Sequence, residues 1–109
     1  MGILDFLKGP NINEGLKTYR QHKYAVLVDL RSEKAFSEGR VPGSINLPLA
    51  QIGKAIYVLD DKTAPIFVYA WDKDDCQKGA TALKALGYTN GTILGDCERY
   101  TGEIEKDEM

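Results

Sequence analysis

Two short, almost uninterrupted apolar runs constrain the fold of this chain more than any other feature. They span residues 24–30 (YAVLVDL) and 65–70 (PIFVYA), and both are rich in β-branched and aromatic residues. Strands that are buried on both faces of a parallel sheet have this composition. We therefore expect both runs to be central strands, with weaker strands over residues 44–47 and 92–94.

Helical segments alternate with these strands. Helical spacing or capping residues predict four of them: residues 13–21 with Asn13 as N-cap, 32–38, 49–59 and 76–86. In the third, Ile52, Ile56 and Leu59 fall on one face, and Gly87 ends the fourth as a C-terminal cap. The alternation predicts an α/β domain whose central, mainly parallel sheet of four or five strands is flanked by helices.

Length and composition limit the class of protein. A chain of 109 residues is the size of one domain, and 43% apolar and 28% charged residues are typical of folded globular proteins. No apolar run approaches the roughly 20 residues that a membrane-spanning helix needs, so we expect no membrane partner. A net charge of −2 without a basic stripe argues against nucleic acid. Cys76 and Cys97 are too few for a disulfide scaffold and indicate a reducing cytoplasm.

We divide the chain into an N-terminal extension at residues 1–10, one domain at 11–104 and an acidic tail at 105–109. The extension lacks the long apolar centre and cleavage site of a signal peptide. Its apolar residues are candidates to cover the sheet or a second subunit, and we expect a monomer or a weak dimer. We expect the tail to be frayed beyond Ile104.

The segment 70–76 (AWDKDDC) is where ligand chemistry is expected. It joins the second central strand to a helix, and ligands of open α/β sheets bind beyond the carboxyl ends of the strands. Unpaired backbone N–H groups and the helix dipole make such a junction an anion site.

Several motifs follow one another along the chain with compatible spacing. They are residues 28–31 (VDLR), 39–48 (GRVPGSINLP), 68–69 (VY), 82–83 (AL), 87–88 (GY), Gly95 and Tyr100. By these motifs the chain resembles single-domain rhodanese-like proteins of the sulfurtransferase family, from about residue 11 to residue 104. The resemblance implies the rhodanese fold, an active-site loop at 70–76, and a pocket bordered by Asp29, Arg31 and Arg40. Arg40 stands where relatives usually carry His, and an ion pair with Glu33 or Glu38 is an equal alternative.

The loop departs from the pattern of the family members that transfer sulfur. Those proteins use Cys-x-x-Gly-x-Arg-Ser, whose cysteine takes up a sulfur atom as a persulfide. Matched without gaps, the nucleophile position is Ala70, and the Gly, Arg and Ser positions are Lys73, Asp75 and Cys76. Alanine cannot hold a persulfide. The loop's net charge of −2 also repels a dianion, since two charges about 4 Å apart interact by roughly 4 kcal/mol near a protein surface.

The resemblance and its departures imply a degenerate active site. Our leading hypothesis is a domain that lacks standard thiosulfate sulfurtransferase activity and serves as a binding or regulatory module. Its partner would be a protein or a small sulfur-containing anion, and no cofactor is expected. The alternative is an enzyme or sulfur carrier that uses Cys76 as a relocated thiol. A third hypothesis is a purely structural protein whose loop is plugged by its own aspartates.

The remaining loop residues each have two interpretations. Cys76 shares a helical stripe with residues that face the sheet, which favours a small buried hydrophobe over a reactive thiol. We interpret Cys97 as a core residue, with a redox pair between the two cysteines as the alternative. Asp72, Asp74 and Asp75 lack calcium-loop spacing, so we expect Asp74 or Asp75 to cap the helix and expect no metal. Trp71 is either a lid on the pocket or an exposed contact.

Overall fold

The computed structural model describes residues 11–108, so the predictions for residues 1–10 lie outside the described part of the chain. The elements, in chain order, are α2 (Ile12–Gln21), β1 (Val26–Asp29), α3 (Glu33–Glu38), β2 (Ile45–Asn46), the 3₁₀ helix η1 (Leu49–Lys54), α4 (Ala55–Val58), β3 (Ile66–Ala70), α5 (Lys73–Ala85), β4 (Gly91–Asp96) and the 3₁₀ helix η2 (Cys97–Arg99). None of the described helices is long and apolar enough to cross a membrane.

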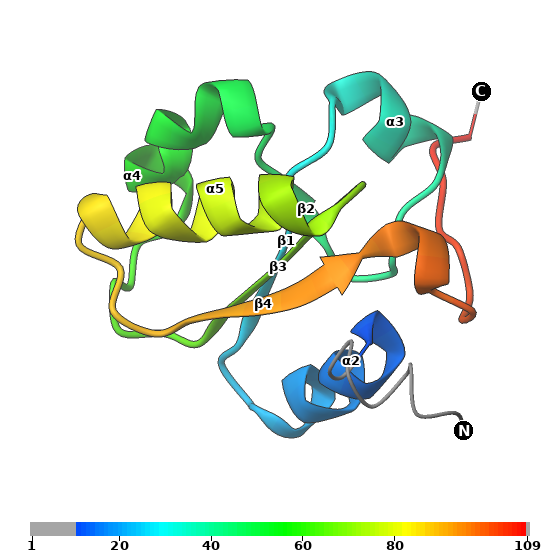
Figure 1. Ribbon diagram of the computed structural model, residues 1–109, viewed down its shortest axis with the longest axis horizontal. Coiled ribbons are helices and arrows are strands. Elements are labelled where there is room, and N and C mark those ends of the chain that lie inside the picture. Colours follow the sequence, from blue (N-terminus) through cyan, green and yellow to red (C-terminus); the bar gives the residue numbers. More distant parts are fainter. Residues whose placement is uncertain (1–10, 109) are drawn as a thin grey trace.

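One sheet organises the described residues. Its four strands run parallel in the order β2-β1-β3-β4, so the two apolar runs of the sequence are its central strands, as predicted. Asp29 at the end of β1 lies beside Tyr69 of β3. The carboxyl ends of β1, β3 and β4 therefore meet at one edge, where the sequence places its candidate loop (Figure 1).

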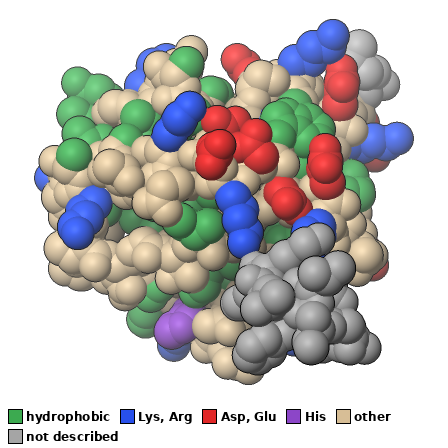
Figure 2. All heavy atoms as spheres, in the orientation of Figure 1, with side chains coloured by type: hydrophobic (Ala, Val, Ile, Leu, Met, Phe, Trp, Pro, Cys, Tyr) green, Lys and Arg blue, Asp and Glu red, His purple; other side chains and the backbone are tan. Residues whose placement is uncertain are grey.

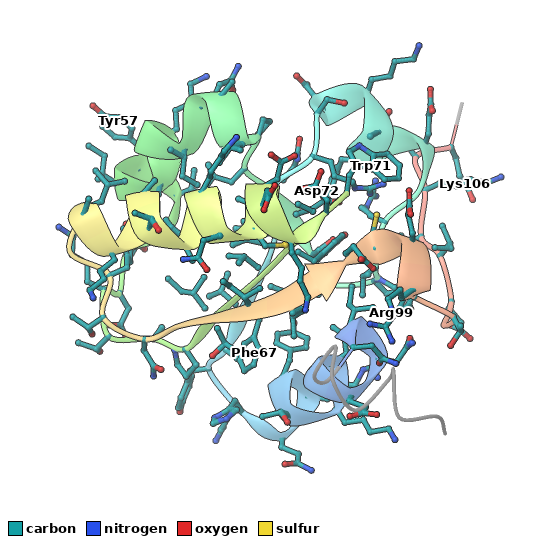
Figure 3. All side chains as sticks on the ribbon, viewed as in Figure 1. Tyr57, Phe67, Trp71, Asp72, Arg99 and Lys106 are labelled. Atoms are coloured by element: carbon teal, nitrogen blue, oxygen red, sulfur yellow. The ribbon has the colours of Figure 1, made fainter. Side chains whose placement is uncertain are left out.

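Each central strand is buried on both faces because its side chains alternate between two apolar clusters. Val28 of β1 and Val68 of β3 pack with Leu83 of α5, on the face that η1 and α4 also cover. Leu27 and Phe67 point the other way and pack with residues of α2. Figures 1 and 3 show the resulting three layers, with α5 and α4 on one side of the sheet and α2 on the other.

Three helix predictions were wrong in detail. The helix expected at 76–86 begins three residues earlier, at Lys73. The first helix begins two residues earlier than expected, because Asn11 is the N-cap and accepts from the Glu14 N–H. Asn13 instead donates to the Arg99 carbonyl at 2.8 Å and accepts from the Thr101 N–H at 3.0 Å. These two bonds tie α2 to the end of the domain.

The segment 49–59 is not one regular helix. It forms η1 and then the single turn of α4, with a non-helical backbone at Gln51. Ala55 and Leu59 face the core, whereas Ile56 is 48% exposed, so the predicted shared apolar face is wrong. Ile56 therefore lies on the outer side of α4.

The acidic tail is held to the domain and is not frayed beyond Ile104. The Glu105 N–H donates to the Arg40 carbonyl at 2.9 Å, and the Arg40 N–H donates to the Glu105 carbonyl at 2.8 Å. The Arg40 guanidinium also pairs with the carboxylates of Glu105 (3.2 Å) and Asp107 (2.8 Å). Glu33 and Glu38, the expected partners of Arg40, do not take part in these ion pairs.

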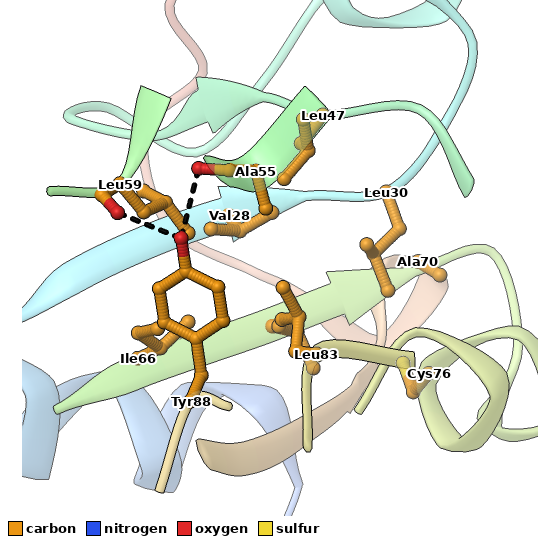
Figure 4. Packing of buried hydrophobic residues seen from close by; sticks show 11 residues of the cluster. Val28, Leu30, Leu47, Ala55, Leu59, Ile66, Ala70, Cys76, Leu83 and Tyr88 are labelled. Atoms are coloured by element: carbon orange, nitrogen blue, oxygen red, sulfur yellow. Dashed lines mark hydrogen bonds between the residues drawn. The ribbon is translucent and has the colours of Figure 1, made fainter. Parts of the chain in front are cut away.

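Tyr88 fixes α4 on the sheet. Its buried hydroxyl lies 2.9 Å from the Ala55 carbonyl oxygen and 2.7 Å from that of Leu59, as Figure 4 shows. The ring packs in the same cluster as Ile66 and Leu83. One side chain therefore anchors both ends of α4 from a position just after α5.

We predict that Tyr88→Phe lowers the free energy of unfolding by about 1–3 kcal/mol, because it removes the buried donor from two carbonyl groups. Urea denaturation measures this loss. Tyr57→Phe, at a tyrosine that is 81% exposed, is the matched control and should leave the unfolding midpoint almost unchanged. Equal effects of the two substitutions would contradict the anchoring role of Tyr88.

Candidate functional site

A buried carboxylate lies at the centre of the sheet edge where the candidate loop begins. Asp29, the last residue of β1, is fully buried. Its Oδ1 accepts from the Arg31 N–H at 2.8 Å, and its Oδ2 accepts from Arg31 Nη2 at 2.7 Å and from the Tyr69 hydroxyl at 2.7 Å. Arg31 Nε lies 3.1 Å from both oxygens. Both carboxylate oxygens are therefore satisfied, Oδ1 by Arg31 and Oδ2 by Arg31 and by Tyr69 of the neighbouring strand β3.

Arg31 is held on several sides. Besides Asp29, it donates to the Gly39 carbonyl at 2.6 Å, and its guanidinium carbon lies 4.8 Å from the centre of the Trp71 ring. Burial alone would lower the pKa of Arg31, but the hydrogen bond and the charge of Asp29 outweigh burial and raise it. Arg31 is thus a permanent cation that is already paired and covered.

Tyr69 joins the loop over residues 39–44 to the same cluster. Its hydroxyl accepts from the Val41 N–H at 3.1 Å and lies 3.1 Å from Ser44 Oγ. Burial and the negative charge of Asp29 raise the pKa of Tyr69, so the hydroxyl stays protonated and donates to Asp29. This role of Tyr69 and Ser44 was not predicted from the sequence. The available signal was the aspartate within an apolar strand, because a buried carboxylate requires hydrogen-bond donors.

The segment 70–76 forms a short junction and then a helix. Ala70 ends β3 and is 1% exposed, and α5 begins only three residues later at Lys73. Asp72 is the N-cap, with its Oδ1 accepting from the Asp75 N–H at 2.8 Å. The prediction that Asp74 or Asp75 caps the helix was therefore wrong, because the backbone of Asp72 is extended and that of the next residues is helical.

Cys76 lies inside the protein. Its side chain is 0% exposed, and its thiol donates to the Gly95 carbonyl at 3.1 Å. Burial raises the pKa of the Cys76 thiol to about 11, and main-chain hydrogen bonds from Gly95 and Ala70 only partly offset this effect. The thiol is a neutral donor between β3 and β4, which is how a small buried hydrophobe behaves.

Two residues at the end of β4 complete this edge of the sheet. Cys97 is partly buried and packs against the α2-side cluster. Burial raises the pKa of Cys97, whereas the nearby charge of Arg31 lowers it. Asp96 Oδ1 is buried and has no hydrogen-bond partner among residues 11–108. Both cysteines are free thiols.

The outer surface of the junction is acidic and aromatic. Asp72 and Asp74 are exposed, Asp75 is partly exposed, and Trp71 is 48% exposed. Figure 2 shows acidic side chains gathered over the start of α5, and Figure 3 shows Trp71 and Asp72 side by side there. Within the described residues, no group of three or more His, Cys, Asp or Glu side chains is arranged to hold a metal ion.

The structure brings together most of the predicted site residues. Arg31 contacts both Asp29 and Trp71. Ala70 ends the neighbouring strand β3, and the Cys76 thiol reaches β4 from α5. Arg40 is the exception. Its guanidinium lies 4.4 Å from the centre of the Phe36 ring and pairs with Asp107 of the tail. Arg40 therefore holds the tail against the domain and does not contribute to the junction.

Comparison with known proteins agrees with this architecture. The model of the rhodanese-like domain family matches residues 13–100, which is most of the chain, and the chain belongs to that family. No curated protein is similar enough to count as a match.

Several solved structures share the fold. A rhodanese with anions from E. coli has a TM-score of 0.68 and 23% identity, over 76% of this chain and 99% of that chain. The Alr3790 protein from Anabaena sp. has a TM-score of 0.75 and 19% identity, over 85% and 88%. A thiosulfate sulfurtransferase from Pseudomonas aeruginosa has a TM-score of 0.73 and 22% identity, over 89% of this chain and 19% of that chain.

We predict that Asp29→Asn lowers the free energy of unfolding by about 3–5 kcal/mol, because it leaves the Arg31 guanidinium buried without a counter-charge. Urea denaturation measures the loss. Glu105→Gln removes a half-exposed carboxylate from one of the two ion pairs of Arg40 and should barely move the midpoint, since Asp107 still pairs with Arg40. An Asp29→Asn protein as stable as the Glu105→Gln control would refute the central role of the buried pair.

We also predict that Cys76 is alkylated at least about 100-fold more slowly in the folded than in the unfolded protein at mildly alkaline pH. A rise of its pKa from 9.0 to about 11 reduces the thiolate by this factor, before the shielding by burial is counted. Iodoacetamide labelling followed by peptide mass spectrometry measures the rate, with the partly exposed Cys97 as internal comparison.

The same pKa shift predicts a pH dependence of stability. Below about pH 9 the thiol is protonated in both states, so its contribution is fully present. As the pH rises toward 11, the unfolded state loses its proton first and the contribution is lost. The wild type should therefore lose stability relative to Cys76→Ala across this window, and a constant difference would contradict the shift.

Proposed function

We propose that this rhodanese-like domain lacks standard thiosulfate sulfurtransferase activity and serves as a binding or regulatory module. The observation that carries the proposal is the junction after β3. A methyl group stands at the position where sulfur-transferring relatives carry a thiol, and an aspartate of the chain caps the helix that follows. The reaction to be excluded moves sulfur from thiosulfate to cyanide, giving thiocyanate and sulfite.

The electrostatics of the junction support the proposal. Asp72 already accepts from the Asp75 N–H, so one helix amide is occupied by a carboxylate of the chain. The acidic side chains beside it oppose a thiosulfate dianion. Arg31 is already engaged by Asp29 and covered by Trp71. An anion approaching this edge therefore meets the negative charge of the aspartates, and the Arg31 guanidinium is not free to bind it.

Three features of Cys76 argue against the alternative, in which this residue replaces the missing nucleophile. The thiol is fully buried, and its pKa of about 11 leaves almost no thiolate at neutral pH. Its proton is donated to the Gly95 carbonyl. A sulfur donor would have to displace the α5 packing before it reached the Cys76 sulfur.

Between the two partner classes, the surface of the junction favours a protein over a small sulfur-containing anion. Trp71 presents a half-exposed ring that is stiffened by the Arg31 guanidinium beneath it. Aromatic side chains of this kind are enriched in protein interfaces, whereas an acidic rim repels an anion. The binding role thus uses the outer face of the junction, while the buried Asp29 cluster holds its shape.

We predict that the wild type forms thiocyanate from thiosulfate and cyanide only at the background rate, and that intact mass spectra show no added sulfur after thiosulfate treatment. Ala70→Cys with Asp75→Arg restores the thiol and reverses the charge at the Arg position. This double variant should take up one sulfur atom. Adding Asp72→Asn, which keeps the cap but removes its charge, should increase the uptake further.

Cys76→Ser is the matched control in both backgrounds. It should leave the wild type unreactive and should not remove the sulfur that the double variant gains. Sulfur uptake by the wild type that disappears in Cys76→Ser would overturn the proposal in favour of the relocated thiol. A folded double variant without any uptake would show that the site has diverged beyond the residues 70–76.

A further inference from the structure

An apolar patch lies around α4, at the end of the sheet opposite the candidate site. Its four members, which we call the α4 patch, are Tyr57 (81% exposed), Tyr24 (74%), Val58 (50%) and Ile56 (48%). Tyr24 and Val58 line one groove of about 410 Å³, together with the first residues of β1 and β3. Figure 3 shows Tyr57 pointing away from the molecule, and hydrophobic side chains gather on that end in Figure 2.

The exposure of these side chains is not required by the fold. Ala55 and Leu59 face the core and are fixed by Tyr88, so the three residues between them are left on the outside. Polar residues at positions 56–58 would leave the hydrogen bonds from Tyr88 to the carbonyls of Ala55 and Leu59 unchanged. Scattered exposed apolar residues need no explanation, but a contiguous group marks an interaction surface.

The charges beside the α4 patch are arranged in a definite order. Lys54 immediately precedes α4, whereas Asp60 and Asp61 follow it, and all three are exposed. Asp61 accepts from the N–H (2.8 Å) and hydroxyl (2.6 Å) of Thr63, which orients its carboxylate and lowers its pKa. The segment 54–61 thus carries a positive charge at its start, apolar side chains in its middle and negative charges at its end.

The charges of the segment 54–61 are complementary to those of a second copy of the same segment that runs in the opposite direction. When two copies are related by a two-fold axis perpendicular to this segment, the two equivalent segments meet antiparallel. Lys54 of one copy then faces Asp60 and Asp61 of the other, at both ends of the contact, while the apolar residues meet in the middle. A partner with two acidic ends or two basic ends would lose one of these ion pairs.

We propose that the α4 patch is a homodimer interface, in which the segments 54–61 of two copies of this chain pack antiparallel. The contact is small. A tyrosine buries about 150–250 Å², so the two tyrosines supply much of what each copy contributes, below the roughly 800 Å² per partner of a standard interface. The dimer is therefore weak and forms at high protein concentration.

Sedimentation equilibrium of the full chain tests the proposal over protein concentrations from about 1 μM to about 1 mM, which span weak association. The average mass should rise from 12.1 kDa toward twice that value. Lys54→Glu alone, and Asp60→Lys with Asp61→Lys, should each weaken association at least about tenfold, because each places like charges face to face. An equimolar mixture of the two variants should restore it, since the charges then match again.

Lys84→Glu changes an exposed lysine of α5, outside the segment 54–61, by the same charge and should leave association unchanged. Tyr57→Ser should weaken association as the charge variants do. A mass of 12.1 kDa at all concentrations would overturn the proposal, as would association that survives Tyr57→Ser or a mixture that stays monomeric. Because the α4 patch lies away from residues 70–76, these outcomes leave the proposed loss of sulfur transfer unaffected.

Discussion

The ion pair between Asp29 and Arg31 holds together the carboxyl ends of the strands, where the candidate site lies. A carboxylate without exposure to water is tolerated in a protein interior only when charge and hydrogen bonds compensate for lost hydration. Here the compensation comes from Arg31 on the same segment and from the Tyr69 hydroxyl on the neighbouring strand. Through Tyr69 the pair also reaches the Val41 N–H and thus the loop over residues 39–44. One buried charge therefore fixes β1, β3 and a long connection relative to one another.

The residues that hold this part of the fold together are different from those of the candidate loop at 70–76. The buried cluster is formed by residues of the motifs VDLR and VY, which the chain retains, whereas the proposed departure from sulfur-transferring relatives lies at Ala70 and the aspartates of the junction. The methyl group of Ala70 takes no part in the hydrogen bonds of Asp29. At the start of α5, Asp72 satisfies the N–H of Asp75. The proposed loss of sulfur transfer is therefore compatible with a folded and well-packed domain.

Strong local signals were sufficient to predict the sheet and several helix ends. The runs at 24–30 and 65–70 have the composition of strands buried on both faces and contain the central strands β1 and β3. Ser32 and Gly87 mark the start of α3 and the end of α5 as expected. The errors arose where long-range contacts decide between equivalent local choices. Asn11 and Asn13 are both capable caps, but Asn13 is engaged by residues 99–101. Arg40 finds its carboxylates more than sixty residues away in the tail, which no local spacing indicates. In the candidate site, the position of Ala70 followed from the motifs, whereas the burial of Cys76 depended on the packing of α5 against β4.

The stacking of Trp71 on Arg31 has a spectroscopic consequence. Trp71 is the sole tryptophan of the chain, so the tryptophan fluorescence, which selective excitation separates from that of the six tyrosines, originates from a single indole at the candidate site. That indole lies against a fixed positive charge and is half in contact with water. Any molecule that settles on the junction, or any opening of α5 at its first turn, changes the polarity around this one ring. The protein thus carries its own fluorescent probe at the candidate functional site, and no label has to be introduced.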